Sequence, residues 1–272
     1  MSSPADLDAL RAFAAEVALQ GAHVAARWFR RAVAVECKGK KAGFDPVTEA
    51  DRAAEAAMRN AIAARFPDHR IIGEEAGETG GDSPWCWYLD PIDGTRAFIA
   101  GLPSWTTLVG LACQGRPVVG AIVQPILKEV FTGVDAGATG GAWLNGRPIA
   151  VSPHPALDEA VLMTTGPEYF SPAEWTAFRR LADRCRIVRY GFDAYAYAML
   201  AAGHVDLVVE SGLAAHDIMA LVPILRGAGG VISGWEPDSA PGVDGGRVLA
   251  AADPALQAAA AGILTDGKTA EA

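Results

Sequence analysis

The sequence predicts an α+β half over residues 1–150 followed by an α/β half over residues 151–272. Three observations lead to this prediction. Apolar residues recur every three or four positions over residues 6–33 and again over residues 48–65, which is typical of two helices. Short apolar runs separated by glycine and proline follow, as in an antiparallel sheet. Beyond residue 155, strand-like and helix-like segments alternate.

Local signals define each element of the first half. Thr48 is a suitable N-cap for the second helix, and Pro67 ends that helix because proline cannot continue it. Asn145-Gly146 lies between two short apolar runs and predicts a hairpin turn. Strands are predicted at 71–72, 85–89, 106–113, 117–124 and 129–134, with a glycine-rich loop at 78–83 and a short helix from 96 to 99.

The second half is divided in the same way. Strands are predicted at 160–164, 186–190, 205–210 and 230–233, and helices at 172–183, 194–202 and 217–227. The segment Gly262–Thr269 matches the letters of a phosphate-binding P-loop. Only three residues follow it, too few for the helix that such a loop requires, so we interpret this segment as a polar tail.

Composition narrows the class of protein. The chain has 272 residues, 23 Lys and Arg against 32 Asp and Glu, and a net charge of −9. Nucleic acid and anionic membranes need clustered positive charge, so neither is the expected main partner. The four cysteines are widely spaced, and the sequence shows neither a signal peptide nor an apolar run near the length that spans a bilayer. These features predict a cytoplasmic protein with reduced thiols.

The segment from Leu89 to Thr95 holds the strongest chemical signal. Asp90 and Asp93 lie at the end of an aromatic strand, and the N–H groups of Gly94 and Thr95 lie where a helix begins. Carboxylates are the ligands that hard divalent cations prefer, and a helix N-terminus favours a phosphate. The alternative is an ordinary turn, because Asp-Pro and Asp-Gly are common turn sequences.

Further acidic groups strengthen the metal hypothesis. Glu74 and Glu75 directly follow the strand at 71–72, and Glu210 ends the strand at 205–210. Several carboxylates gathered without a cation would repel one another, and metal binding removes that conflict. For Asp51 and Asp217 a purely structural role remains open, because Asp51 is also a favourable first-turn acid of a helix and Asp217 is a suitable helix N-cap.

Together these segments resemble the inositol monophosphatase superfamily of magnesium-dependent phosphomonoesterases. The matching motifs are residues 45–51, 73–75, 90–95 and 217–230, in family order over nearly the whole chain. The resemblance implies a five-layered αβαβα sandwich and two or three Mg²⁺ ions per site, with Mn²⁺ as a substitute. It implies Glu74, Asp90, the Ile92 carbonyl, Asp93 and Asp217 as metal ligands, Thr95, Asp45 and Glu75 as catalytic residues around a metal-activated water, and Gly94 and Thr95 as the phosphate cradle.

The segment from Glu210 to Trp235 is more similar to the histidinol-phosphate phosphatases of this superfamily than to its inositol enzymes. The expected substrate is therefore L-histidinol phosphate, with Glu210 pairing with its ammonium group. His216 either lines the substrate pocket or only packs beside it. The alternatives are an inositol-1-phosphate phosphatase, a broad sugar or polyol phosphatase and, less favoured, a nucleotide-bisphosphate phosphatase or a non-enzymatic transcription partner. The resemblance and the symmetry of most oligomers predict a homodimer.

Overall fold

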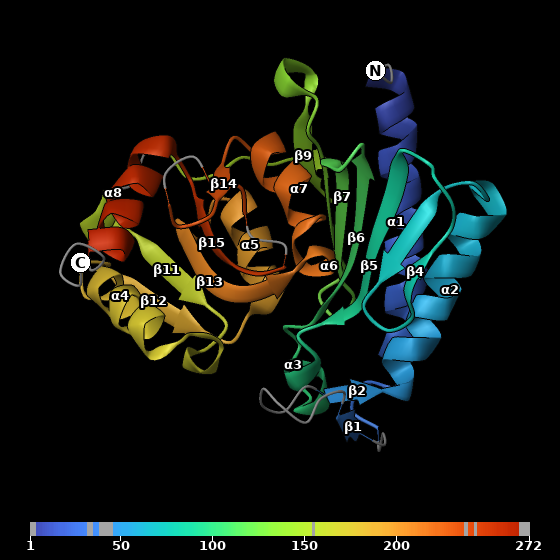
Figure 1. Cartoon of the computed structure of the whole chain (residues 1–272), viewed down its shortest axis with the longest axis horizontal. Coiled ribbons are helices and arrows are strands. Elements are labelled where there is room, and N and C mark those ends of the chain that lie inside the picture. Colours follow the sequence, from blue (N-terminus) through green and yellow to red (C-terminus); the bar gives the residue numbers. More distant parts are fainter. Residues whose placement is uncertain are drawn as a thin grey trace.

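The computed structural model describes residues 4–31, 35–37, 46–153, 156–236, 239–241 and 244–266. Asp45, the basic loop at 38–41 and the end of the P-loop-like segment lie outside these residues. The two N-terminal helices are α1 (Pro4–Ala26) and α2 (Glu49–Arg65). They pack on each other and cover one face of the larger sheet (Figure 1). The N-cap prediction is confirmed, because the Thr48 side chain accepts a hydrogen bond from Ala50 N.

The larger sheet has eight strands in the order β10-β9-β8-β7-β6-β5-β3-β4. All neighbours are antiparallel except β3 and β5. The predicted glycine-rich loop at 78–83 is partly wrong, because Gly77–Thr79 forms an edge strand. The strands are β3 (Arg70–Gly73), β4 (Gly77–Thr79), β5 (Trp85–Asp93), β6 (Thr106–Cys113), β7 (Arg116–Gln124), β8 (Glu129–Val134), β9 (Gly141–Leu144) and β10 (Arg147–Pro148). The helix α3 (Thr95–Ile99) follows β5, and β1 (Val35–Cys37) pairs with β2 (Pro46–Thr48) in a separate ribbon.

The smaller sheet has five strands in the order β12-β11-β13-β15-β14. They are β11 (Val161–Thr164), β12 (Ile187–Tyr190), β13 (Leu207–Ala214), β14 (Val231–Ser233) and β15 (Asp244–Ala251). The helices α4 (Pro172–Ala182) and α8 (Pro254–Thr265) pack together on its outer side (Figure 1). Short 3₁₀ turns are η1 (Gly137–Thr139), η2 (Leu157–Glu159) and η3 (Pro167–Tyr169).

The sequence reasoning missed β15 and α8. The α8 sequence is rich in alanine and has no marked polar face, so the amphipathic pattern that predicts helices is absent. A local signal was present, because Asp253 caps the helix and Pro254 occupies its first turn. Residues 262–265 are helical, so this part of the P-loop-like segment is not a loop and the rejection of that motif is confirmed. The interpretation as a polar tail is wrong for these residues, because they end α8 and Leu264 is buried in the core.

The middle layer consists of α5 (Asp193–Ala201), α6 (Ala215–Ile218) and α7 (Leu221–Gly227), between the two sheets (Figure 1). The single helix predicted at 217–227 is therefore two helices, and Asp217 lies inside the first of them. One hydrophobic core joins residues of the large sheet, such as Leu108 and Phe131, to Tyr195 and Leu221 of the middle layer. The five-layered αβαβα expectation is confirmed. The division of the chain near residue 150 remains a proposal.

A row of glycines seats the middle layer on the large sheet. Gly110, Gly120 and Gly133 are direct neighbours across β6, β7 and β8. A Cβ atom at Gly120 would lie 2.0 Å from the carbonyl oxygen of Ala220, and one at Gly133 would lie 2.4 Å from Ile224 Cα. The backbone of Met219 and Ala220, which joins α6 to α7, and that of α7 therefore rest directly on the sheet. This contact fixes where α6 presents Asp217.

Candidate functional site

Three carboxylates meet where β5 ends beside α6. One oxygen each of Asp90, Asp93 and Asp217 lies within 4.8 Å of the other two. The pairing of β5 with β6 is irregular between Asp90 and Asp93, at the position of Pro91. Proline has no N–H to donate to the sheet, so the strand bends there. The structure thus brings together three of the predicted metal ligands, two from one strand end and one from a helix 124 positions later in the chain.

Hydrogen bonds orient these three carboxylates. Asp90 accepts from its neighbour Ile92 N at 3.0 Å, and Asp217 accepts from Ala214 N at 2.7 Å. Asp93 accepts from Ala194 N at 2.8 Å and from Thr106 Oγ1 at 3.2 Å. Each carboxylate is therefore fixed by a group from its own turn or from a neighbouring element.

The negative charges of this cluster would be balanced by a bound cation. Burial raises the pKa of Asp90 well above its usual value, and the charges of Glu74, Asp93 and Asp217 raise it further. Burial also raises the pKa of Asp93, with Asp193 and Asp217 adding to the effect. Carboxylates this close together cannot all ionise cheaply without an ion between them. Three clustered carboxylate oxygens, from the buried Asp90 and the half-buried Asp93 and Asp217, are the kind of donor that Mg²⁺ prefers, so the residues present fit a divalent cation.

Two other predicted ligands border the cluster. Glu74 acts electrostatically on Asp90, although it is not one of the three residues whose oxygens meet within 4.8 Å. The Ile92 carbonyl accepts a hydrogen bond from Thr95 Oγ1 at 3.1 Å. A carbonyl oxygen has a second lone pair, so this bond is compatible with metal binding.

Gly94 immediately precedes α3 in a backbone conformation that favours glycine. Its φ is +80°, in the left-handed region that favours glycine. A Cβ atom there would lie 3.1 Å from Asp193 Oδ2. The predicted phosphate cradle, the backbone of Gly94 and Thr95, therefore lies at a helix start beside the carboxylate cluster.

A buried glutamate that the sequence reasoning missed supports the Glu74–Glu75 segment. Glu55 on α2 is 1% exposed. Its carboxylate accepts from Glu75 N at 2.7 Å, from Ala76 N at 3.0 Å and from Arg59 Nε at 2.7 Å. In the sequence, Glu55 is one more polar residue in an alanine-rich helix, so only the contacts reveal its role. The backbone of the loop that presents Glu74 is thus held by α2.

Asp51 is the acid of the 45–51 motif that the structure describes. It is fully buried, and its Oδ2 accepts from Thr48 N at 2.9 Å. Its Oδ1 has no hydrogen-bond partner among the described residues. Burial raises the pKa of Asp51 to about 6, its bonds to Thr48 oppose this, and the charge of Glu74 adds to the rise. Asp51 is therefore a first-turn acid of α2, as the structural alternative held, where it completes the capping box of Thr48, and its Oδ1 has no partner among the described residues.

Two further carboxylates lie beyond the metal cluster. Glu210 is 3% exposed, and both the N–H and the hydroxyl of Thr165 donate to its Oε1 at 2.8 Å. Burial raises its pKa to about 8, against the bonds from Thr165. Asp193, which the sequence reasoning missed, begins α5 with a φ of +45°. Burial raises its pKa to about 6, and Arg96 opposes this rise.

His216 lies beside the cluster. Its Nε2 is 3.5 Å from Asp217 Oδ1, and its side chain is 21% exposed. The residue therefore contacts a candidate metal ligand and is also accessible, which keeps it as a candidate pocket residue. Trp105, directly before β6, is not a pocket residue, because it is fully buried.

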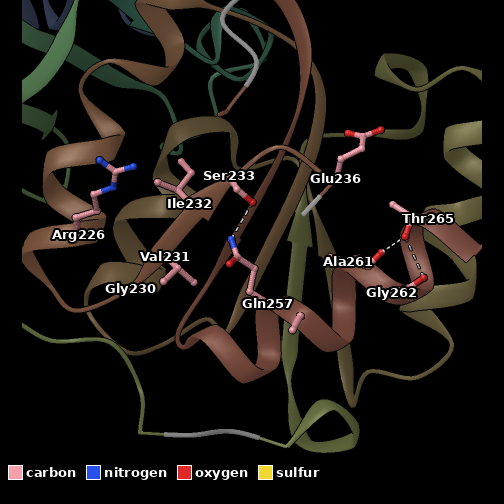
Figure 2. A pocket seen from close by; sticks show the side chains of 11 residues that line it. Arg226, Gly230, Val231, Ile232, Ser233, Glu236, Gln257, Ala261, Gly262 and Thr265 are labelled. Atoms are coloured by element: carbon pink, nitrogen blue, oxygen red, sulfur yellow. Dashed lines mark hydrogen bonds between the residues drawn. The ribbon is translucent and has the colours of Figure 1, made fainter. Parts of the chain in front are cut away.

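A cavity of about 500 Å³ lies elsewhere, along β14 and α8. Figure 2 shows Ser233 and Gln257 hydrogen-bonded to each other at its centre, at 2.9 Å. None of the clustered carboxylates lines this cavity. The candidate site is thus defined by its carboxylates, and the cavity along β14 and α8 is separate from it.

Comparisons with known proteins agree with the fold and the acidic cluster. The model of the inositol monophosphatase family matches residues 6–268. A bifunctional phosphatase IMPL2 of Arabidopsis thaliana, named as chloroplastic, is 42% identical over 86% of this chain and 66% of its own length. A histidinol-phosphatase of Chlorobaculum parvum is 35% identical over 68% of this chain and 71% of its own. A Nus factor SuhB of Pasteurella multocida is 36% identical over 71% of this chain and 73% of its own.

Among solved structures, an inositol monophosphatase from Zymomonas mobilis superposes with a TM-score of 0.83. It is 38% identical and the match covers 97% of this chain and 99% of that one. Fold, acidic cluster and matches together define a hydrolase that acts on phosphomonoesters. The chain belongs to the inositol monophosphatase family. Across its described residues, no helix combines the length and the apolar character needed to cross a membrane.

Proposed function

We propose that this protein is a magnesium-dependent phosphatase that hydrolyses L-histidinol phosphate to L-histidinol and phosphate. The observation that carries the proposal is a pair of carboxylates beside the metal cluster, the buried Glu210 and the half-buried Asp193. A phosphate ester of a neutral alcohol needs no such pair. An ester whose alcohol carries an ammonium group, and an imidazole that can also be charged, matches it.

The proposed mechanism uses this chain's residues to hold the ions, the phosphate and the water. Asp90, Asp93 and Asp217, with Glu74 and the Ile92 carbonyl, would hold two or three Mg²⁺ ions, and Mn²⁺ has the same preference for oxygen ligands. When bound, the metal lowers the pKa of water and neutralises charge on the leaving oxygen. The N–H groups of Gly94 and Thr95 would bind the phosphate oxygens at the start of α3.

Thr95 and a carboxylate would orient the attacking water. The carboxylate that the sequence motif pairs with Thr95 is Asp45, which lies outside the described residues. Asp51 supports this role, because it is buried, has an oxygen without a partner and is influenced by Glu74. We therefore propose Asp51 as the carboxylate that accepts the water's hydrogen bond, while Asp45 and Glu75 remain catalytic candidates of the sequence motif. In-line attack on phosphorus then depends mainly on the positions of these groups.

Substrate choice would depend on Glu210. Its Oε1 is fixed by two bonds from Thr165, so the carboxylate has a defined orientation. An ammonium group bound there would return a buried carboxylate to its charged form, which burial otherwise disfavours. An inositol hydroxyl can also donate to this carboxylate, so an inositol-1-phosphate phosphatase, or a broader polyol phosphatase, is the second candidate. The similarity to the inositol monophosphatase of Zymomonas mobilis favours that alternative.

The test compares kcat/KM for L-histidinol phosphate, inositol 1-phosphate and β-glycerophosphate with magnesium present. We expect L-histidinol phosphate to be preferred, and Glu210→Gln to weaken it far more than β-glycerophosphate, because a substrate cation loses its partner. Glu78→Gln is the matched control, since Glu78 is an exposed glutamate paired with Arg70. A tenfold preference of the wild type for inositol 1-phosphate would reject the histidinol assignment and leave the phosphatase mechanism intact.

We also propose a homodimer located in the cytoplasm. Apolar side chains exposed near one end of the large sheet support the dimer: Leu102 and Leu127 are each 54% exposed. Gln124 hydrogen-bonds to both of their loops, through Pro103 O and Leu127 N.

For the location, Cys86, Cys113 and Cys185 are free thiols, as a reducing compartment would keep them. The molar mass from light scattering and the position of a tagged protein in cell fractions test the two proposals.

A further inference from the structure

The cavity along β14 and α8 lies at the edge of the smaller sheet, because β14 is the last strand in that sheet. Three small residues of α8, Ala258, Ala261 and Gly262, leave it open, and Val231 and Ile232 of β14 also line it. Its volume of about 500 Å³ is within the range of small-molecule sites. A ligand bound here would not touch the carboxylates of the candidate active site.

A side-chain amide lies at the centre of this cavity. Gln257 Nε2 donates to Ser233 Oγ at 2.9 Å (Figure 2), and Ser233 Oγ donates to Gly234 O at 2.6 Å. These two bonds orient the Gln257 amide. Across the described residues no hydrogen bond reaches Gln257 Oε1, so the amide still offers this acceptor and its second N–H donor. Either atom can bond to a peptide group, which carries one N–H and one C=O.

Charged groups of opposite sign lie on either side of this amide. Figure 2 shows Arg226 on one side and Glu236 on the other. The Arg226 side chain is 42% exposed, and its Nη1 lies 3.0 Å from Asp135 Oδ2. Arg116 Nη2 lies 3.5 Å from the other oxygen of the same carboxylate. Two guanidinium groups thus surround one carboxylate, so this end of the cavity favours an added negative charge.

The opposite balance of charge holds at Glu236. Its carboxylate is bonded to Arg247, whose Nε also lies 3.9 Å from Glu174 Oε1. Two carboxylates therefore share one guanidinium group, and this end favours an added positive charge. A ligand that matches the cavity carries an anion at one end, an amide in the middle and a cation at the other end.

We propose that this cavity is a second ligand site and that its ligand is a short zwitterionic peptide, with a free amino and a free carboxyl end. The peptide's carboxylate lies at Arg226, its amide bonds to Gln257 and its ammonium group lies at Glu236. The aliphatic residues of the lining contact small apolar side chains of the peptide. The site does not depend on the proposed substrate, because it shares no residue with the candidate active site.

A chemical-shift titration by NMR with the dipeptide L-alanyl-L-alanine tests the proposal, on the full chain with magnesium present. The dipeptide should bind with a Kd of about 3 mM, as expected for a ligand with so few atoms. Acetylation of its amino end removes the cation, and amidation of its carboxyl end removes the anion. Each change should weaken binding about fivefold, the effect of one partly exposed ion pair.

A filling variant tests whether the dipeptide occupies the cavity. Gly262→Leu should abolish binding, because the new side chain enters the cavity, where a Cβ on Gly262 meets no atom within 4 Å. Leucine also favours a helix more than glycine does, so the fold should be kept. Ala259→Leu, at an exposed position of α8 outside the lining, is the matched control and should bind the dipeptide as the wild type does.

Variants at the two charged ends test the class of ligand. Arg226→Gln should weaken the dipeptide about fivefold and leave its carboxyl-amidated form unchanged, because that form has no anion to lose. Glu236→Gln should weaken the dipeptide equally and leave its acetylated form unchanged. Arg189→Gln, on β12 at the opposite edge of the same sheet, is the control and should change none of the three affinities.

The outcomes that would overturn the proposal are distinct. No shift at ten times the expected Kd, or equal binding by Gly262→Leu, would show that the cavity does not hold such a peptide. Equal affinity for the three forms of the dipeptide would show that the charged ends do not recognise it. Turnover of β-glycerophosphate should be the same in all these variants, so a failure of the proposed substrate would leave this result unaffected.

Discussion

Buried carboxylates occur in two settings in this molecule, one near each end of the Glu74–Glu75 loop. Glu55 on α2 is almost fully buried and accepts hydrogen bonds from two backbone N–H groups and from Arg59. Asp90 is equally buried, but it faces Glu74, Asp93 and Asp217. The pKa of Asp90 is raised well above its usual value by burial and by these like charges.

The difference shows that a buried carboxylate can serve either the stability of the fold or the chemistry of a site, depending on the groups around it. When hydrogen-bond donors of the protein surround a carboxylate, they balance its charge, so removing the carboxylate lowers the stability of the fold. A carboxylate surrounded by other carboxylates is compensated only by an added cation, so its removal costs function and relieves repulsion. The two settings therefore predict opposite responses to neutral substitution.

The largest expected effect is at Asp90. Asp90→Asn should lower kcat/KM by about three orders of magnitude, because a neutral amide replaces a central ligand and the metals lose charge compensation. Without metal, the variant should melt at the same temperature as the wild type or higher, since repulsion with its neighbours is removed. Turnover and calorimetry in EDTA are the two measurements. Half of wild-type turnover would show that Asp90 is not a ligand.

Thr95→Ala should have the next largest effect. Loss of the hydroxyl that orients water should lower kcat by about 100-fold and raise KM much less. Steady-state kinetics with saturating magnesium measures both constants. Thr106→Ser, which keeps a hydroxyl facing Asp93, is the control and should keep most of the activity. A change confined to KM would instead place Thr95 in substrate binding.

Glu55→Gln should act mainly on stability. The variant leaves Arg59 without its charged partner in a largely buried place, so the free energy of unfolding should fall by about 2 kcal/mol, or about 5 °C in Tm. Thermal unfolding in EDTA isolates this effect from metal binding. Glu78→Gln, in an exposed pair with Arg70, is the control and should shift Tm by less than about 1 °C. Equal shifts in the two variants would contradict the structural role of Glu55.

The smallest expected effect is a dependence of the metal-free protein on pH. The folded state raises the pKa of Asp51 and Asp193 to about 6 and that of Glu210 to about 8. The folded protein therefore binds more protons than the unfolded chain between about pH 4 and pH 8, so its stability falls as pH rises through this window. Tm in EDTA should fall by about 4 °C from pH 5 to pH 8. Saturating magnesium should flatten the slope, and an unchanged slope would contradict a cation at this site.

The sequence predicted the metal cluster better than the groups around it. Asp90 and Asp93 lie in one short motif, and Asp217 lies in another, so local patterns identified them. Asp193 had no such pattern, because its role depends on α5 starting against α3, about 100 positions away in the chain. The structural alternative for Asp51 was only a first-turn acid, since a sequence cannot show that one of its oxygens is left without a partner.

The same contrast holds for the fold. Strands with strong turn signals, such as those around Asn145-Gly146, lie where they were predicted. The helix α8 was missed because alanine-rich segments lack a polar face. The break between α6 and α7 was missed although Pro223, which lacks the N–H that a continuous helix needs, lies in the first turn of α7. Tertiary contacts, more than local preference, decide such elements.

The glycine row beneath α6 and α7 has a consequence for how this enzyme can change over generations. Because the backbone of these helices rests directly on that of β6, β7 and β8, the position of Asp217 relative to Asp90 does not depend on the size of any intervening side chain. The residues proposed to bind the substrate's cation, Asp193 and Glu210, lie on other elements, α5 and β13. Mutations at such residues can change which alcohol's phosphate ester the enzyme accepts without moving the candidate metal ligands. Substrate specificity can therefore evolve separately from catalysis.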